Sequence, residues 1–247
     1  MGERLKGKIA VVTGASRGMG LGISKAFANE GAQVAMLSRS QDELTKAAAE
    51  IPGASAFVCD VADPDAVRAA FNAVEAKLGG IDILINNAGT ASPQLLEEAD
   101  DRLVQMEVGI NLLGPLYCMR SAIAAMRRRG GGDIINVSSE SVMSQYPHLS
   151  FYAATKSALE TLTAGARGEL KGSNIRVTLY RSGRVQSTFH HRWDPDIAAK
   201  VRELAVSGGF VQNSGGSIAV DIPGKAMVDL VLLDRSAHID IMQLRGV

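Results

Sequence analysis

The stretch Ile9-Ala10-Val11-Val12-Thr13-Gly14-Ala15-Ser16-Arg17-Gly18-Met19-Gly20 decides which fold the sequence predicts. Its apolar first half is typical of a buried strand, and the amphipathic stretch 21–29 that follows is typical of a helix. A second apolar run at 33–37 closes a strand–helix–strand unit. Glycines in such a turn let backbone N–H groups approach a pyrophosphate, whose charge the helix N-terminus favours. The sequence therefore predicts a dinucleotide site. A simple turn is the alternative, since the first glycines are spaced more widely than in G-x-G-x-x-G.

Basic side chains lie where a dinucleotide-binding fold selects its ribose. At the end of the second strand an acidic residue binds a ribose 2′-hydroxyl, whereas a basic residue accommodates a 2′-phosphate. This sequence has Ser38-Arg39 at that point, and Arg17 lies in the glycine turn. Two guanidinium groups converging on one phosphate favour NADP(H) over NAD(H). Two solvated arginines without a ligand are the alternative.

The rest of the chain repeats the alternation of strand and helix. Helical patterns such as 64–78 and 155–169 separate the apolar runs. This alternation predicts a parallel sheet with right-handed crossovers and helices on both faces. We expect the α/β class, with one Rossmann-type doubly wound domain over residues 1–247. The apolar runs are 9–12, 34–37, 56–59, 83–85, 134–137 and 176–179.

Tyr152 and Lys156 form a candidate acid/base pair. If the segment after Tyr152 is helical, residues four apart share a face, so the Lys156 ammonium lies near the phenol. A neighbouring positive charge favours phenolate and lowers the pKa of a phenol. Ser139 follows an earlier apolar run and belongs to the same carboxyl edge of the predicted sheet as Gly14 and Asn87. The alternative is a Tyr and a Lys on a solvated helix face.

Further motifs occur in order along the chain. They are Thr13-Gly14-x-x-x-Gly18-x-Gly20, Asp60-Val61, Asn86-Asn87-Ala88-Gly89, Asn111, Ser139 and Tyr152-x-x-x-Lys156. With these motifs the chain resembles the short-chain dehydrogenase/reductase family over nearly its whole length. The resemblance implies an NAD(P)-dependent oxidoreductase with a Rossmann-type fold.

The resemblance also implies roles for individual residues. Tyr152 would pass a proton to or from the substrate oxygen, which Ser139 would hydrogen-bond. Lys156 would bind the nicotinamide ribose and lower the pKa of Tyr152, and Asn111 would anchor a water that relays the proton to solvent. The implied NADP(H)-binding residues are Gly14, Ser16, Arg17, Gly18, Met19, Gly20, Ser38, Arg39, Asp60, Val61, Asn87, Ala88, Gly89, Tyr152, Lys156, Gly183, Val185 and Ser187.

We therefore expect an enzyme that moves hydride between NADP(H) and a carbonyl or secondary alcohol of a small molecule. A catalytically silent NADP(H)-binding sensor or scaffold is the alternative, because the turn after the sixth strand departs from the family pattern. There Ser182 replaces the family's proline, which removes a fixed φ and predicts a looser turn. Arg181 and Arg184, beside this turn, are candidates for contact with an anionic substrate, and a solvated side chain is the alternative for Arg184.

Residues 188–217 form a candidate substrate lid. Aromatic residues flanked by glycines suit a segment that closes over a substrate and excludes water, although interface sequence has the same composition. His190-His191 lacks a third ligand, so no metal site is expected. We predict that Glu140, Ser141, Met143, Tyr146 and His148 form the opposite wall of the pocket, and a solvated loop charge is the alternative for Glu140.

The C-terminal end also departs from the family. The family's usual Asp-Gly-Gly strand is absent, and residues 237–244 alternate in a pattern that predicts a last strand with one buried face. This tail resembles a subgroup of NADP-dependent reductases that act on small hydroxy acids, hydroxy amino acids and assorted carbonyl compounds.

The composition limits the class of partner and the compartment. Lys plus Arg equals Asp plus Glu at 26 each, so no net charge attracts nucleic acid or an anionic membrane. We see no secretory segment and no apolar run of roughly 20 residues, and both cysteines lie in apolar contexts, so we expect a cytoplasmic protein. The amphipathic stretches 103–125 and 153–169 are candidates for helix pairing in a homodimer or homotetramer.

Overall fold

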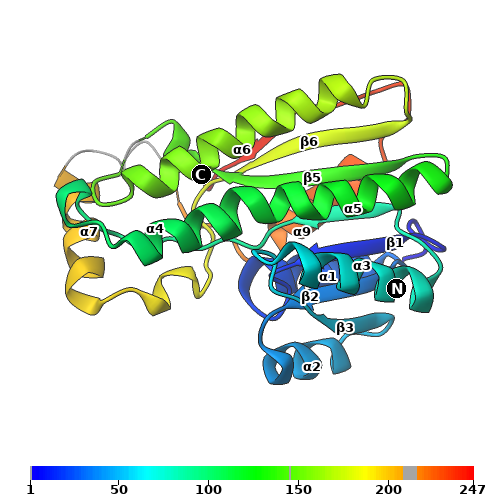
Figure 1. The fold of residues 1–247 in the computed structure, drawn as a ribbon, viewed down its shortest axis with the longest axis horizontal. Coiled ribbons are helices and arrows are strands. Elements are labelled where there is room, and N and C mark those ends of the chain that lie inside the picture. The colour runs from blue at the N-terminus through cyan, green and yellow to red at the C-terminus, as the bar shows by residue number, and fades with distance from the viewer. Residues whose placement is uncertain (1, 145, 208–215) are drawn as a thin grey trace.

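The computed structural model describes residues 2–144, 146–207 and 216–247. Within these residues seven parallel strands form one sheet in the order β3-β2-β1-β4-β5-β6-β7 (Figure 1). The order reverses between β1 and β4, the kind of switch point at which open α/β sheets bind ligands. The strands are β1 (Ile9–Thr13), β2 (Gln33–Ser38), β3 (Ala54–Val58), β4 (Ile83–Asn86), β5 (Gly132–Ser139), β6 (Ile175–Ser182) and β7 (Ile241–Leu244).

Helices cover both faces of this sheet, which confirms the predicted doubly wound α/β fold (Figure 1). One face carries α1 (Gly18–Asn29), α2 (Gln41–Ala49) and α9 (Ile222–Val231). The other face carries α3 (Pro64–Leu78), α5 (Gly114–Arg128) and α6 (Ser150–Glu169). The remaining elements are η1 (Leu96–Glu98), α4 (Asp101–Val108), η2 (Gly109–Leu113), η3 (Glu140–Val142), η4 (Phe189–Arg192) and α7 (Pro195–Ser207).

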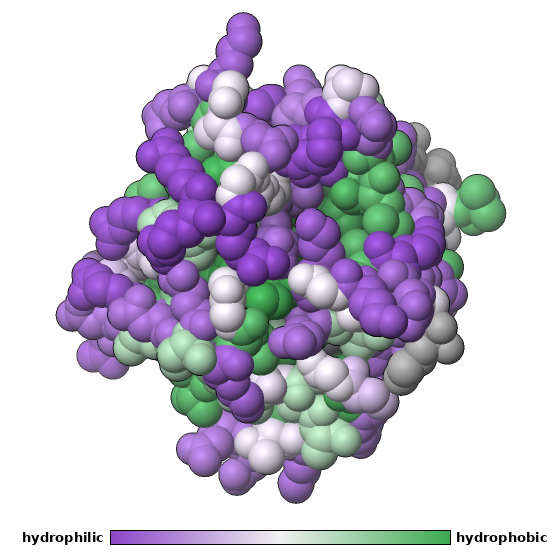
Figure 2. All heavy atoms as spheres, turned by 90° about the vertical axis from the view of Figure 1, so that its right-hand side faces the viewer, coloured by the Kyte–Doolittle hydropathy of each residue, from purple (hydrophilic) through white to green (hydrophobic). Residues whose placement is uncertain are grey.

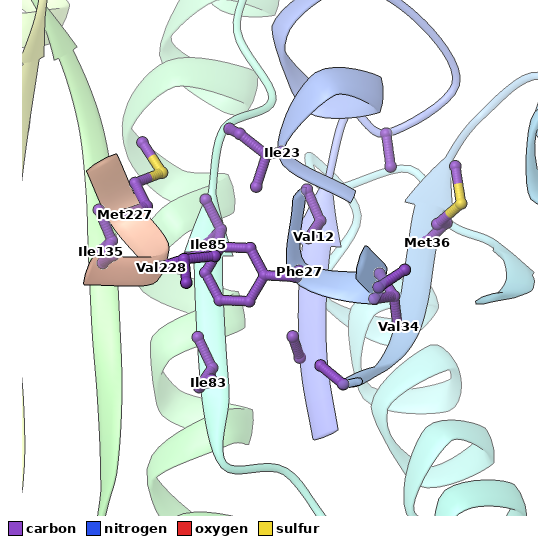
Figure 3. Packing of buried hydrophobic residues seen from close by; sticks show 14 of the residues in the cluster. Val12, Ile23, Phe27, Val34, Met36, Ile83, Ile85, Ile135, Met227 and Val228 are labelled. Atoms are coloured by element: carbon purple, nitrogen blue, oxygen red, sulfur yellow. The ribbon is translucent and has the colours of Figure 1, made fainter. Parts of the chain in front are cut away.

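The core forms because successive strand side chains point to opposite faces. Val12 of β1 belongs to the cluster under α1, α2 and α9, whereas Val11 belongs to the cluster on the other face. Figure 3 shows the Phe27 ring of α1 beside Ile85 and Val228, which ties α1 and α9 to the sheet. Each such fully buried side chain contributes about 1.5–3 kcal/mol. This packing holds the carboxyl ends of the strands in place.

A continuous helical run, Asp101–Arg128, contains α4, the π turn η2 and α5. By length and composition this run is long and apolar enough to cross a membrane, so the expectation that no stretch reaches that length is wrong. Its apolar side chains Cys118, Met119 and Ala122 are buried on the sheet, as those of a core helix are.

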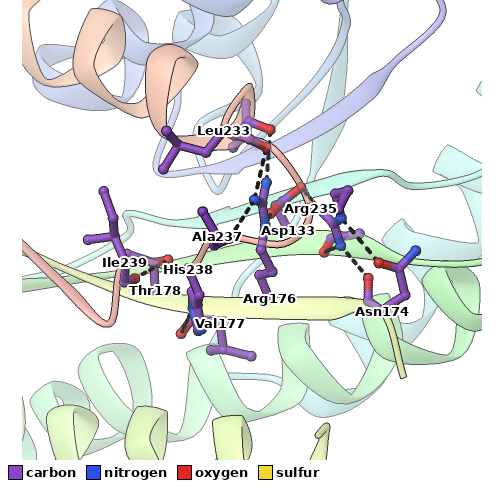
Figure 4. Close-up of polar contacts among 12 residues, drawn as sticks. Asp133, Asn174, Arg176, Val177, Thr178, Leu233, Arg235, Ala237, His238 and Ile239 are labelled. Atoms are coloured by element: carbon purple, nitrogen blue, oxygen red, sulfur yellow. Dashed lines mark hydrogen bonds and ion pairs between the residues drawn. The ribbon is translucent and has the colours of Figure 1, made fainter. Parts of the chain in front are cut away.

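The C-terminal strand is shorter than predicted. β7 begins at Ile241, and its residues are partly buried or exposed. Met242 and Leu244, two residues apart, pack against the core under α1, α2 and α9, so the predicted burial of one face is confirmed in part. The preceding segment is irregular because its carbonyl groups bond elsewhere: Arg176 of β6 donates to the carbonyls of Leu233 and Ala237 and pairs with Asp133 at 2.6 Å (Figure 4). This cluster of hydrogen bonds and ion pairs around Arg176 holds the chain between α9 and β7 against the amino ends of β5 and β6.

The end of the molecule at the amino ends of the strands is mostly hydrophilic. Figure 2 shows this end, with smaller hydrophobic areas between the hydrophilic residues. The predicted site residues belong to the carboxyl ends of the strands, at the opposite end of the sheet.

Candidate active site

A cavity of about 610 Å³ lies at the carboxyl ends of the strands. Every residue predicted to bind the cofactor lines it, from the glycine turn after β1 to the turn after β6. Ser139 lines it too, whereas Asn111 does not. The structure therefore brings these residues together around one space, and their individual roles stay predictions.

The glycine turn packs directly onto the loop after β4. Gly14 has a φ of +65°, and a Cβ there would lie 2.9 Å from the Ala88 Cα. A Cβ on Gly20 would lie 2.2 Å from the Gly14 carbonyl oxygen. Thr13 joins the two loops, because its hydroxyl accepts hydrogen bonds from the backbone N–H groups of Asn87 and Ala88, each at 3.0 Å. The Asn87 side chain donates back to the Thr13 carbonyl, so it has a structural role besides its predicted one.

The end of the cavity beside β2 is rich in charged side chains. Arg17 precedes α1, and Arg39 lies 3.8 Å from the carboxylate of Asp60, with both arginines exposed. Sequence reasoning missed Glu43, which lines the same end and accepts a hydrogen bond from Ser16 at 3.5 Å. Its place in the first turn of a helix just after β2 was the available signal. Two cations and one extra carboxylate therefore surround the position expected for the ribose.

The candidate catalytic residues meet where β5 ends and α6 begins. Tyr152 and Lys156 share one face of α6, and the Lys156 Nζ lies 5.9 Å from the centre of the Tyr152 ring. The buried Lys156 ammonium donates to the Val137 carbonyl at 2.9 Å. Ser139 lies at the end of β5 and hydrogen-bonds the Tyr152 phenol. The predicted face sharing is therefore confirmed.

The expected lowering of the Tyr152 pKa by Lys156 is not found. Burial raises the pKa of Tyr152 to about 12 and outweighs the hydrogen bond from Ser139, which lowers it. Burial also lowers the pKa of Lys156 to about 8. Desolvation disfavours the charged form of each group, and here it is stronger than their neighbours' effects.

Asn111 lies behind the cavity on the π turn. Its side chain accepts from the Thr90 N–H at 2.9 Å and donates to the Thr90 carbonyl at 2.8 Å. It also donates to Thr155 of α6 at 3.1 Å. π turns occur often at functional sites. Asn111 thus joins the loop after β4 to the helix that carries Tyr152 and Lys156.

The profile of the short chain dehydrogenase family matches residues 8–198. The chain belongs to that family. Dehydrogenase/reductase SDR family member 11 of Gallus gallus is 34% identical to it over 216 residues, which cover 81% of this chain and 85% of that protein. D-threitol dehydrogenase of Mycolicibacterium smegmatis is 32% identical over 212 residues, 84% of this chain and 82% of that protein. Some other curated relatives are longer, and the match covers 58% of their length.

Solved structures agree with this assignment. The crystal structure of L-sorbose reductase from Gluconobacter frateurii, complexed with NADPH and L-sorbose, matches with a TM-score of 0.85 and 28% identity. The match covers 99% of this chain and 97% of that chain. The family assignment predicted from the motifs is confirmed.

In this short-chain dehydrogenase, backbone pairing orders the turn that the sequence predicts to be loose. The Gly183 N–H donates to the Leu244 carbonyl of β7 at 2.8 Å. The Gln186 N–H donates to the Ile218 carbonyl, and the Ile218 N–H donates to the Arg184 carbonyl, each at 2.9 Å. These hydrogen bonds order the turn in this chain, whereas in the family the fixed φ of a proline does so.

The structure does not support Arg181 as a candidate for substrate contact. Its guanidinium pairs with Glu160 of α6 at 2.6 Å, and the side chain does not line the cavity. Glu160 also accepts from Ser138 at 2.8 Å. Arg184 does line the cavity, so it stays a candidate for substrate contact.

Part of the predicted lid lines the cavity, including Phe189 and Trp193. Phe189 of η4 lies beside Tyr152, with 5.9 Å between ring centres. Trp193 donates to the Ala91 carbonyl at 2.9 Å, which ties this segment to the loop after β4. Residues 208–215 of the predicted lid lie outside the described residues. The closing motion stays a prediction.

The opposite wall of the pocket is confirmed in part. Glu140, Ser141 and Tyr146 line the cavity, whereas Met143 and His148 do not. Met143 is 61% exposed, because η3 turns its side chain outward. Across the described ranges, no three His, Cys, Asp or Glu residues group as metal ligands would.

Sequence reasoning missed Glu107 of α4. It is only 1% exposed, and one carboxylate oxygen accepts a hydrogen bond from the Ser92 backbone N–H. A Glu on an amphipathic helix usually indicates a solvated face. The sequence offers no signal that this one points inward.

Proposed function

We propose that this short-chain dehydrogenase transfers hydride between NADP(H) and a carbonyl or secondary alcohol of a small molecule, with Tyr152 as acid/base. The convergence of Ser139, Tyr152 and Lys156 on one cavity, with the glycine turn and two arginines along the same cavity, carries this proposal. The NADPH and L-sorbose named for the sorbose reductase, and the polyol named for the threitol dehydrogenase, support a small polar substrate.

The residues of the cavity suit an NADP(H) cofactor. A Cβ at Gly14 or Gly20 would collide with backbone, so the turn stays open to a pyrophosphate only with glycine there. Arg17 and Arg39 suit a 2′-phosphate. When bound, the cofactor supplies or accepts the hydride.

The chain's own residues would manage the substrate oxygen. The Ser139 hydroxyl would donate a hydrogen bond to that oxygen and hold it beside the Tyr152 phenol. With a pKa of about 12, the phenol carries its proton at neutral pH, and reduction of a carbonyl requires that state. In the oxidation direction the same phenol oxygen would accept the proton.

Substitution of the phenol tests this assignment. In Tyr152→Phe, turnover should fall by roughly 10²–10⁴-fold because the acid/base is lost, while NADPH binding stays measurable. NADPH absorbance with ketoses, aldehydes, hydroxy acids and polyols measures turnover, and fluorescence titration measures NADPH binding.

Tyr117→Phe, outside the cavity, is the matched control. Full activity in Tyr152→Phe would reject the acid/base role. Wild-type protein that binds NADPH but turns over none of these substrates would favour the sensor or scaffold.

A further inference from the structure

Glu107 is a buried carboxyl group for which the mechanism above has no use. Only 1% of the residue is exposed. Its Oε1 accepts from the Ser92 N–H, and its Oε2 has no hydrogen-bond donor among the described residues. A buried carboxylate with an unbonded oxygen is costly unless a proton or an opposite charge compensates it. The surroundings of Glu107 therefore have to supply one of the two.

The loop after β4 connects Glu107 to the catalytic lysine. Glu107 binds this loop at Ser92, and Asn111 of the adjoining π turn binds it at Thr90. Three residues before Ser92 the same loop passes Lys156, because a Cβ on Gly89 would lie 3.4 Å from the Lys156 Nζ. The Glu107 carboxyl group thus binds this short loop at Ser92, and the Lys156 ammonium group lies beside it at Gly89, where the loop lines the cavity.

The buried Lys156 ammonium in turn requires a negative charge nearby. It is 3% exposed, and the hydrogen bond found for its ammonium goes to the neutral Val137 carbonyl. A buried ammonium without a counter-charge tends to lose its proton. We propose that Glu107 is the internal charge partner of Lys156, a positioning residue that keeps the catalytic ammonium charged. As far as it concerns catalysis, this inference rests on the proposed function.

The electrostatics have the sign that this pairing requires. Burial is the larger effect on both groups: it raises the pKa of Glu107 and lowers the pKa of Lys156 to about 8. The charge of each group opposes this effect on the other, because the charge of Glu107 raises the pKa of Lys156 and the charge of Lys156 lowers the pKa of Glu107. The Glu107 charge also raises the pKa of Tyr152.

Other charged groups near the site have their own partners. Glu160, one turn further along α6, pairs with Arg181. Glu140 of η3 interacts with Arg184 and Arg245. Glu107 of α4 is the carboxyl group whose charge raises the pKa of Lys156.

The direct test is a titration of Lys156 in the full-length protein. NMR of ¹³Cε-labelled lysine follows its ammonium, with the signal assigned by its loss in Lys156→Met. In Glu107→Gln the pKa of Lys156 should fall by roughly one unit, because a favourable neighbouring charge is removed. Glu97→Gln, an exposed site on η1, should leave it unchanged. Equal Lys156 titrations in the two variants would overturn the proposal.

A reciprocal titration covers the case in which Glu107→Gln does not fold. In Lys156→Met, ¹³C NMR of the side-chain carboxyl should show the pKa of Glu107 raised by a similar amount, because coupling between two sites is mutual. A pKa of Glu107 that is the same as in the wild type would count against the pair. Neither titration needs a substrate, so both stand if the proposed function fails.

Turnover supplies the functional readout. Without the Glu107 charge, the pKa values of both Lys156 and Tyr152 fall, so the pH profile of kcat should move to lower pH in the oxidation and the reduction directions alike. Glu107→Asp keeps the charge and should return the profile toward the wild type. A purely structural defect would lower kcat without moving the profile, and would reject the catalytic part of the proposal.

Discussion

At the scale of single residues, the choice of cofactor depends on two exposed guanidinium groups. Arg39 lies 3.8 Å from Asp60, a distance that leaves the guanidinium able to turn toward a phosphate. Glu43, at the same end of the cavity, opposes a second negative charge there. NADP(H) is therefore preferred only if Arg17 and Arg39 attract the 2′-phosphate more strongly than Glu43 repels it.

Removal of one guanidinium should change the preference between the two cofactors. Arg39→Ala should raise the Kd for NADPH by roughly tenfold or more, because a hydrogen bond to a charged group is worth about 1.5–3 kcal/mol. The Kd for NADH should change little, and fluorescence titration measures both. Arg68→Ala, an exposed arginine paired with Asp65, is the control. Equal losses for NADPH and NADH would exclude contact with the 2′-phosphate.

Local patterns predict the residues whose function depends on neighbours in sequence. Gly14 follows a strand at a set distance, and Tyr152 and Lys156 are one helical turn apart. Glu107 and Arg181 escape such patterns, because Ser92 and Glu160, which hold them, are 15 and 21 residues away. Their orientation is a property of the packed structure.

At the scale of elements, a cluster of ion pairs around Asp133 holds the amino ends of β5 and β6 to the segment before β7. Asp133 at the start of β5 binds Arg176 at 2.6 Å and Arg235 at 2.8 Å, and the Arg176 side chain is only 10% exposed (Figure 4). Arg176 also donates to four backbone carbonyls, one at the last residue of α9 and three beyond it. The segment before β7 is consequently irregular, although its alternating sequence predicts a strand.

Loss of this arginine should destabilise the fold. Arg176→Met should lower the free energy of unfolding by about 3–5 kcal/mol, because it leaves Asp133 buried with only one partner and frees the carbonyl groups. Urea unfolding followed by circular dichroism gives the value. Arg68→Met, which removes an exposed pair, should cost less than about 1 kcal/mol. Equal losses of unfolding free energy in the two variants would show that the ion pairs around Asp133 do not stabilise the fold.

At the scale of the whole molecule, the alternation of strand and helix was sufficient to predict the sheet and its two covered layers. The reason is that β1, β2, β4 and β5 are buried on both faces, so each of them leaves a continuous apolar signal in the sequence. The lid and the pocket wall were predicted less well. Tyr146 and Met143 lie in one short segment, yet only Tyr146 lines the cavity.

We also expect the molecule to form a homodimer or homotetramer through the helices within 103–125 and 153–169. Leu103 and Leu116 on the first of these are 36% and 39% exposed. Leu116→Arg should shift the oligomer toward smaller species, because a charge opposes burial at an interface. Light scattering after size-exclusion chromatography measures the mass. Leu232→Arg, 38% exposed at the end of α9, is the control. A wild-type monomer would contradict this expectation.

Because of the π turn, the number of residues between α4 and α5 determines which way Glu107 points. An α-helix turns by about 100° per residue, so deleting one residue from Gly109–Leu113 would restore regular bonding and rotate α4 about its axis relative to α5. This rotation would move the Glu107 side chain away from Ser92 and from Lys156. A gap at this point in a relative would therefore signal a differently charged catalytic centre, even where every motif residue is retained.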